Sequence, residues 1–130
     1  MPHYRWEEVR EEKLNPWLSR RFIAGERVML AQIHLKKGGL VPVHKHVHEQ
    51  FSHVLKGSVK FTLSGRKYVL NEGEVLHIPS NKVHSAEAAE DSEVLDVFSP
   101  IREDWLSGDD GYLRDVKTPG KPKRKPSKKR

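Results

Sequence analysis

At residues 39–50 the chain reads GLVPVHKHVHEQ, which places three histidines at alternate positions and follows them with a carboxylate and an amide. Alternate residues of an extended strand point to the same side, so we expect His44 and His46 to face the same way. Neutral imidazole is the commonest metal ligand in proteins. The stretch therefore predicts a metal site.

The reach of the chain limits which side chains can share one ion. A strand rises about 3.3 Å per residue, so a straight strand would place Gln50 roughly 20 Å from His44. The chain must therefore bend between His46 and Gln50 if this stretch supplies a third ligand. Spacing alone leaves His48, Glu49 and Gln50 open for that place. A surface loop rich in histidine is the plain alternative, and three histidines at alternate positions argue against it.

Short apolar runs separated by turn residues predict an all-β domain. Lys-Gly at residues 56–57 and Ser-Gly at 64–65 mark turns between them. No helical pattern alternates with these runs, so a sandwich or barrel is favoured over a βαβ fold. We expect strands at residues 27–35, 51–55, 59–63, 68–70, 75–78, 83–86 and 94–98.

The two ends of the chain predict little tertiary structure. We expect a short helical or irregular entry over residues 4–17 and one or two helical turns over 101–106. Residues 117–130 hold eight of the 24 Lys and Arg residues and no acidic residue. The rest of the chain has 16 basic and 18 acidic residues, which gives it a net charge of −2. The net charge of +6 therefore comes from this tail. We expect the tail to be disordered, and any nucleic-acid binding to depend on it alone.

Composition narrows the class of protein. A chain of 130 residues suits one domain with its own core. The absence of cysteine excludes disulfides, thiolate metal sites and a cysteine nucleophile. No apolar run is long enough to span a bilayer, and the charged N-terminus lacks the apolar stretch of a signal peptide. A cytoplasmic protein with no membrane partner is the expectation.

Two motifs follow one another in the chain. The first is Gly39-x4-His44-x-His46-x3-Gln50-x6-Gly57, and the second is Gly73-x5-Pro79-x-Asn81-x2-His84. They resemble the two motifs of the cupin superfamily, with Asn81 where Gly is usual. The resemblance implies a double-stranded β-helix, a jelly-roll barrel with short terminal helical segments and one divalent metal ion in its mouth. The ligands that it implies are His44, His46, Gln50 and His84.

The implied ligand set bears on the chemistry of the ion. Three histidines and Gln50 are all neutral, so a divalent ion would keep its +2 charge and act as a strong Lewis acid. These ligands permit nickel, zinc, manganese, iron or copper. Glu49 in place of Gln50 would instead favour the carboxylate-containing triad of non-haem iron oxygenases.

A second informative stretch, LDVFSPIREDWL, occupies residues 95–106. Asp96 and Phe98 alternate on an expected strand and should face one side, and Arg102 follows a turn bounded by proline. Asp can act as a general acid or base, and Arg binds carboxylate or phosphate through paired hydrogen bonds. Phe98 can pack against a sugar ring. The plain alternative is an ion-paired Asp96 and a core Phe98.

The run DVFSPIREDWL, followed by GDDGYLR at residues 108–114, is similar to small single-domain cupins of the KdgF type. These proteins act in pectin and alginate breakdown. The resemblance covers residues 20–114 and implies conversion of a 4,5-unsaturated uronate ring to a linear keto acid. Asp96 would move a proton, Arg102 would hold the uronate carboxylate, and Phe98 would lie beside them. It also implies a homodimer.

The sequence thus predicts an N-terminal extension at residues 1–19, a barrel at 20–116 and a basic tail at 117–130. Two other functions stay open. One is a metal-dependent dioxygenase, which would contain iron or manganese and consume oxygen. The other is a non-catalytic cupin that binds a small ligand or has a regulatory role.

Overall fold

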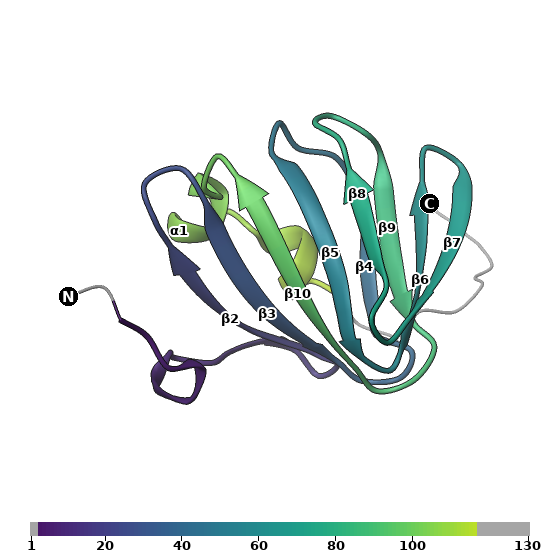
Figure 1. Cartoon of the computed structure of the whole chain (residues 1–130), viewed down its shortest axis with the longest axis horizontal. Helices are drawn as coiled ribbons and strands as arrows, with labels where there is room; N and C mark the ends of the chain where they lie inside the picture. The colour runs from purple at the N-terminus through teal and green to yellow at the C-terminus, as the bar shows by residue number, and fades with distance from the viewer. Residues whose placement is uncertain (1–2, 117–130) are drawn as a thin grey trace.

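The computed structural model describes residues 3–116, which form two antiparallel β-sheets around one hydrophobic core (Figure 1). The predicted all-β jelly-roll fold is confirmed, and the helices are short. Sheet A has the order β1 (Glu12–Asn15), β2 (Leu18–Ala24), β3 (Met29–Leu35), β10 (Ser92–Ser99), β5 (Glu49–Lys56) and β8 (Val75–Ile78). Sheet B has the order β4 (Leu40–His44), β9 (His84–Ala88), β6 (Ser58–Leu63) and β7 (Arg66–Asn71). The helical elements are η1 (Trp6–Glu8), α1 (Glu103–Leu106) and α2 (Gly111–Arg114).

Alternation along the strands separates the core from the outer faces. In β3, Met29, Ala31, Ile33 and Leu35 are buried, whereas Leu30 between them is 36% exposed. Successive side chains of a strand point to opposite faces, which explains this pattern. Burial of each large aliphatic side chain contributes about 1.5–3 kcal/mol, so this inner row contributes substantially to stability.

Strand β10 lies in the middle of sheet A, between β3 and β5. Asp96 pairs with Ala31 on one side and with Ser52 on the other. Phe98 lies two residues further on and pairs with Gln50 of β5. The register therefore places Asp96, Phe98 and Gln50 on the same inner face.

The structure contains three strands that were not predicted, β1, β2 and β4. Residues 4–17 are not only helical or irregular, because β1 forms within them. Strand β4 was not predicted, and it ends at His44, so the prediction that His44 and His46 share a strand is wrong. The predicted bend before Gln50 is confirmed, at Val47 and His48.

Two turns carry residues of the motifs in left-handed backbone conformations. Gly57 has a φ of +86°, and a Cβ there would overlap the carbonyl oxygen of Asp91 and the side chain of Ser92. Only glycine fits such a position. Asn81 has a φ of +63°. Asn adopts this conformation more readily than other residues with a side chain, which accounts for its presence where cupins usually carry Gly.

The C-terminal segment, residues 100–116, packs α2 against β1 of sheet A and β4 of sheet B. Trp105 and Leu113 of this segment are buried in the core. The Asn15 side-chain amide donates a hydrogen bond of 2.7 Å to the Leu113 carbonyl. In Figure 1 this segment lies behind the strands of sheet A. It therefore supplies one wall of the barrel interior.

The structure bears on two further predictions. Among residues 3–116, the longest helices are single turns, and none could cross a membrane. The predicted disorder and basic character of residues 117–130 lie outside the described residues.

Candidate metal centre

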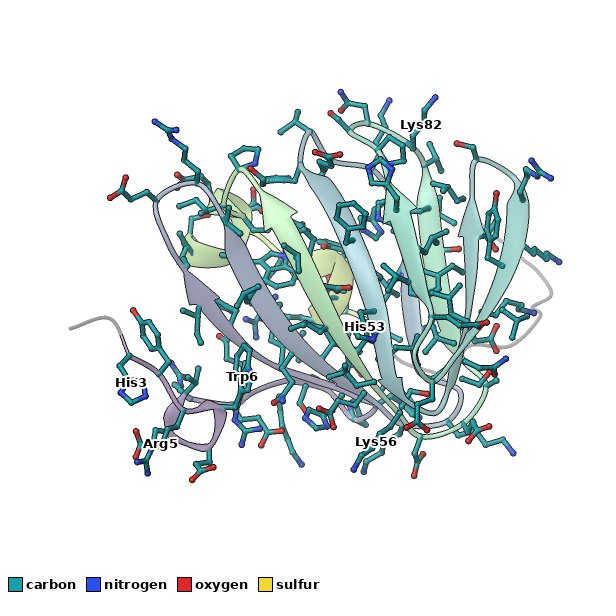
Figure 2. All side chains as sticks on the ribbon, in the orientation of Figure 1. His3, Arg5, Trp6, His53, Lys56 and Lys82 are labelled. Atoms are coloured by element: carbon teal, nitrogen blue, oxygen red, sulfur yellow. The ribbon has the colours of Figure 1, made fainter. Side chains whose placement is uncertain are left out.

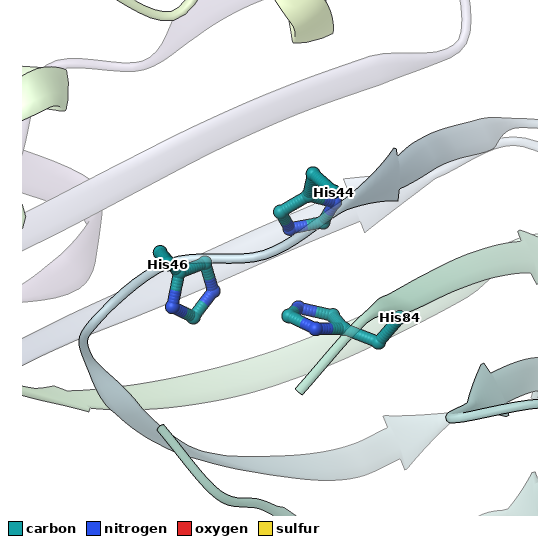
Figure 3. Close-up of side chains that lie close together, drawn as sticks. All are labelled: His44, His46 and His84. Carbon is teal, nitrogen blue, oxygen red and sulfur yellow. The ribbon is translucent and has the colours of Figure 1, made fainter. Parts of the chain in front are cut away.

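Three imidazole rings meet at one end of the barrel (Figure 3). His44 ends β4, His46 lies in the loop that follows, and His84 begins β9. Their candidate ligand atoms all lie within 4.8 Å of one another. Two nitrogens that each lie about 2.1 Å from one ion are at most about 4.2 Å apart, so small side-chain adjustments would suffice to bind it.

Backbone hydrogen bonds orient all three rings. Each ring uses Nδ1 to contact a carbonyl oxygen, which leaves Nε2 free to act as a ligand. The acceptors for His44, His46 and His84 are the carbonyls of Pro42, His48 and Lys82, at 2.7, 3.1 and 2.8 Å. Metal-binding histidines usually have such a partner on the second nitrogen, because it sets the tautomer and the ring orientation.

The two loops that carry the histidines are joined directly. The Asn81 backbone N–H donates a hydrogen bond of 2.8 Å to the His46 carbonyl. The Ser80 hydroxyl donates one of 2.6 Å to the Val47 carbonyl. The left-handed turn at Asn81 thus holds His46 in place relative to His84.

Gln50 brings an oxygen to the same point. It is buried on the inner face of β5, and its Oε1 lies 3.1 Å from His46 Nε2. Its amide N–H donates to the Ser52 hydroxyl at 2.9 Å, which leaves the oxygen directed at His46. The bend at residues 47–48 makes this approach possible, since a straight strand would not allow it.

The contacts of His46 test whether a cation fits this site. A neutral imidazole has one donor and one acceptor, yet both ring nitrogens of His46 face oxygen acceptors, the His48 carbonyl and Gln50 Oε1. A second proton would satisfy both, but loss of water on burial, together with the charge of Arg102, lowers the His46 pKa to about 3. Buried Nε2 of His84 also has no partner. A divalent cation would pair with Nε2 of His46, Nε2 of His84 and the oxygen of Gln50, so the residues fit a metal.

Burial keeps the other rings neutral as well. It lowers the pKa of His44 to about 4 and also lowers the pKa of His84. Neutral imidazole is the form that binds metals, so the rings need not lose protons at neutral pH.

The two alternatives to Gln50 lie elsewhere. Glu49 points to the outer face of sheet A, where its carboxylate lies 2.7 Å from His77 Nε2. His48 is buried, but it is outside the group of converging histidines. The outer face also holds His53 of β5 (Figure 2).

Asp96 is joined to Gln50 through one side chain. The Ser52 hydroxyl accepts from the Gln50 amide and donates to Asp96 Oδ1 at 2.5 Å. Burial raises the pKa of Asp96 to about 6, although the Ser52 hydrogen bond and the charge of Arg102 favour its ionised form. Near neutral pH this carboxyl group can therefore both give up and accept a proton.

Phe98 and Arg102 lie on the other side of His46. The Phe98 ring is 6.0 Å from the His46 ring in an edge-on arrangement, and the Arg102 guanidinium stands 4.8 Å from the centre of Phe98. Arg102 is 2% exposed. It donates two hydrogen bonds to Asp104, at 3.0 and 2.7 Å, and one to the Tyr112 hydroxyl at 3.0 Å. Its Nε and Nη2 are therefore already engaged.

One cavity of about 60 Å³ connects these groups. Its lining includes six of the seven predicted site residues, which are His44, Gln50, His84, Asp96, Phe98 and Arg102. His46 borders the same cluster through Gln50. The structure thus brings all seven predicted residues to one region.

Several residues of this region were not predicted. Tyr112, whose ring lies 4.8 Å from His44, stands in the GDDGYLR run but had no assigned role. Arg20 and Trp105 also line the cavity. A signal existed for Arg20, since it occupies an inward position between Leu18 and Phe22, where alternation predicts an apolar residue.

Comparisons with known proteins agree with this fold. Residues 31–98 match the family model described as a cupin domain. The structure of KdgF from Halomonas sp. is 30% identical, with 77% of this chain and 94% of that chain covered and a TM-score of 0.73. An RmlC-like cupin from Shewanella frigidimarina is 28% identical, with 81% and 96% covered and a TM-score of 0.77.

A more distant structure shares the fold alone. A predicted oxalate decarboxylase from Thermotoga maritima is 21% identical, with 75% of this chain and 97% of that chain covered and a TM-score of 0.67. No curated protein sequence matches the chain. The family model covers more than half of the chain, and the chain therefore belongs to the cupin family.

Proposed function

We propose that this cupin is a metal-dependent enzyme that opens the ring of a 4,5-unsaturated uronate and yields the linear keto acid. The observation that carries the proposal is the position of Asp96. Its carboxyl group lines the cavity and is joined to Gln50 through Ser52, and its pKa is raised to about 6 by burial. The similarity to KdgF supports the substrate class.

His44, His46, His84 and Gln50 would hold the divalent ion. When bound, the ion would supply Lewis acidity, which makes an attached hydroxyl group more acidic and stabilises negative charge on oxygen. Because all four side chains are neutral, they would not offset its charge. The lone pairs of three Nε2 atoms and of Gln50 Oε1 support this assignment.

Asp96 would move the proton that the reaction requires. Ring opening removes the proton of the anomeric hydroxyl, breaks the bond between C1 and the ring oxygen, and leaves an aldehyde at C1 and an enolate at C5. The enolate then becomes a ketone as C4 gains that proton. The reaction is an isomerisation with no net gain or loss of protons, so one carboxyl group can accept the proton and return it.

Arg102 and Phe98 would position the substrate. Arg102 Nη1 makes no hydrogen bond within the described residues and could donate to the uronate carboxylate. Asp104 holds the guanidinium in place and balances its charge, so the selectivity for an anion would come jointly from Arg102 and the +2 site. Phe98 lines the cavity and would pack against the sugar ring.

The test is an assay with 4,5-unsaturated galacturonate, in which loss of the enol-ether absorbance is followed for metal-loaded and metal-stripped protein. We expect faster loss with the loaded protein. Equal rates would contradict the proposal. Oxygen uptake measured in the same mixture should be zero, and uptake that depends on iron would favour the dioxygenase instead.

We also propose a homodimer that forms through the outer face of sheet A. Leu30, Val97 and Phe51 are neighbours across its three central strands, and Leu30 and Phe51 are 36% and 45% exposed. Since β3 and β5 flank β10 equally, a twofold axis through β10 would bring Leu30 of one copy against Phe51 of the other.

Sedimentation velocity tests this dimer. The unchanged protein should sediment as a dimer and Phe51→Glu as a monomer. Val69→Glu places the same charge at an exposed valine of sheet B and should leave the dimer intact. A monomeric wild type would contradict the proposal.

A further inference from the structure

Two residues that line the cavity each carry a buried hydrogen-bond donor with no acceptor within the described residues. The donors are Arg20 Nη1 and Trp105 Nε1. Arg20 is fully buried and Trp105 is 6% exposed, so bulk water does not serve them. Both residues line the same cavity as His44, His84 and Asp96. Buried donors are almost always paired, so such a pair needs an explanation.

The rest of Arg20 is held rigidly by neighbours. Its Nε donates to Glu12 at 2.8 Å and its Nη2 to Asp110 at 2.5 Å. The guanidinium carbon stands 4.2 Å from the centre of the Trp105 ring. These contacts fix the direction of Nη1, which leaves one nitrogen of the group without a role in the fold.

Trp105 is fixed from both sides. Arg20 lies over its indole, and the Arg102 guanidinium also stands 4.7 Å from the ring centre. Phe98 meets it edge-on at 5.1 Å. The indole therefore links the arginine that we place at the substrate carboxylate with an arginine further along the cavity wall.

The charge around Arg20 indicates the kind of oxygen that it would take. Arg20 and Arg114 are positive, and their partners Glu12 and Asp110 are negative, so the four side chains balance. An anion would gain little from a cluster with no net charge. A neutral acceptor, such as a hydroxyl or carbonyl oxygen, needs only the hydrogen bonds that Nη1 and the indole N–H offer.

We propose that Arg20 and Trp105 form a second recognition point in the cavity, which binds a hydroxyl or carbonyl oxygen of the substrate away from its carboxylate. This inference rests on the proposed use of the cavity as the substrate site. Arg20 and Trp105 would then select for substrate size. A small acid would reach Arg102 and the ion, but it would not reach Arg20 Nη1 or the Trp105 indole N–H.

The experiment is binding to the metal-loaded protein by isothermal titration, with two probes that do not react, D-galacturonate and glycolate. We expect Trp105→Phe, which keeps the ring and removes the N–H, to weaken galacturonate about 3- to 10-fold, the loss that one neutral hydrogen bond produces. Arg20→Lys should act in the same direction. Glycolate affinity should stay within about twofold in both variants.

Arg114→Gln is the matched control, because it removes the other cation of the charge-balanced cluster without touching the cavity. It should bind both probes like the wild type. Equal losses for galacturonate and glycolate in the two test variants would show a general disturbance and overturn the proposal. Unchanged galacturonate affinity, or no galacturonate binding by the wild type, would overturn it too.

A spectroscopic readout separates a direct contact from a structural effect. Galacturonate should shift the indole N–H resonance of Trp105. That resonance is assigned by its absence from the spectrum of Trp105→Phe. Trp6 at the N-terminal turn (Figure 2) and Trp17 do not line the cavity, and their resonances should stay in place. If the Trp105 resonance is unmoved under saturating galacturonate, the donor does not contact the ligand. Turnover is not needed for either readout, so failure here is distinct from failure of the proposed reaction.

Discussion

The histidine cluster and the ion-paired cluster around Arg20 meet at one cavity, which His44, His84 and Arg20 line, but they are built in opposite ways. His44, His46 and His84 are uncharged and converge on one point, and Nε2 of His84 has no protein partner. Arg20 and Asp110 are both fully buried, and each ends in an ion pair. The first arrangement is suited to binding a cation, whereas the second attaches the C-terminal segment to the barrel. Side chains of the histidine cluster should therefore be replaceable without unfolding the protein, whereas loss of the buried ion pair should strongly destabilise it.

The largest effect should follow from Asp110→Ala. It leaves the buried Arg20 charge without its main partner, and breaking a buried pair in this way costs about 3–5 kcal/mol. We expect a loss of roughly 10–20 °C in the thermal unfolding midpoint. Asp109→Asn alters the exposed neighbouring acid and should change the midpoint little. If both variants melt alike, the ion-paired cluster does not stabilise the fold.

Asp96→Asn should lower turnover without affecting either end of the cavity. The amide keeps the shape of the side chain but cannot transfer the proton, so we expect a loss of about 10²–10⁴-fold in kcat. Metal content, measured by mass spectrometry after dialysis, should be unchanged. Glu93→Gln, on the opposite face of the same strand, is the control. A variant that keeps full activity would remove Asp96 from the mechanism.

His84→Ala should reduce metal affinity by roughly 100-fold or more, because one of four ligands is lost. The free energy of unfolding of the metal-free protein should fall much less than in Asp110→Ala, since the free nitrogen of His84 has no protein partner. His77→Ala removes an exposed histidine of sheet A and should keep the metal. Equal metal loss in both variants would contradict the assigned site.

The smallest expected effect is a loss of stability of the metal-free protein at acidic pH. Burial lowers the pKa of His44 and His46 to about 4 and 3 from 6.5, so the unfolded chain takes up protons first as the pH falls below 6.5. Stability of the metal-free protein should therefore decrease between pH 6.5 and 4. Asp96 works the other way, because its pKa is raised to about 6 and the folded state gains its proton first.

Two histidines outweigh one carboxyl group, and we expect a net loss of about 1–3 kcal/mol at pH 4.5, where each unit of pKa difference is worth about 1.4 kcal/mol. Urea denaturation at pH 7 and pH 4.5 measures it. His44→Gln should flatten the dependence. A protein that becomes more stable in acid would show that these rings are not held neutral.

The sequence predicted the histidines that converge but not the ion-paired end, and the difference has a physical reason. The converging histidines fall in two short motifs, and the spacing of each is set by one turn and one bend. Arg20 and Asp110 are 90 residues apart, and nothing local in either segment indicates the pairing. The alternation along β2 marks Arg20 as inward-facing but cannot identify its partner.

Of the three strands that were not predicted, β1 and β4 are edge strands, whereas β2 lies inside sheet A, where the buried Arg20 interrupts the apolar alternation. Edge strands are often short and polar, as β1 is, and they tolerate proline, which β4 contains at Pro42. These features weaken the pattern at β1 and β4, although the edge strand β8 was predicted at its observed bounds, and His44 stands at the end of β4.

The central place of β10 has a consequence for how the molecule is made. It is the last strand within residues 3–116, yet it separates β3 from β5, so sheet A stays divided until residue 99 has been synthesised. A nascent chain that stops earlier exposes two unpaired strand edges, which invite association with other chains. The inner face that places Gln50 beside Phe98 and Asp96 also forms only then. Metal loading should accordingly follow synthesis of the barrel rather than assist its early stages.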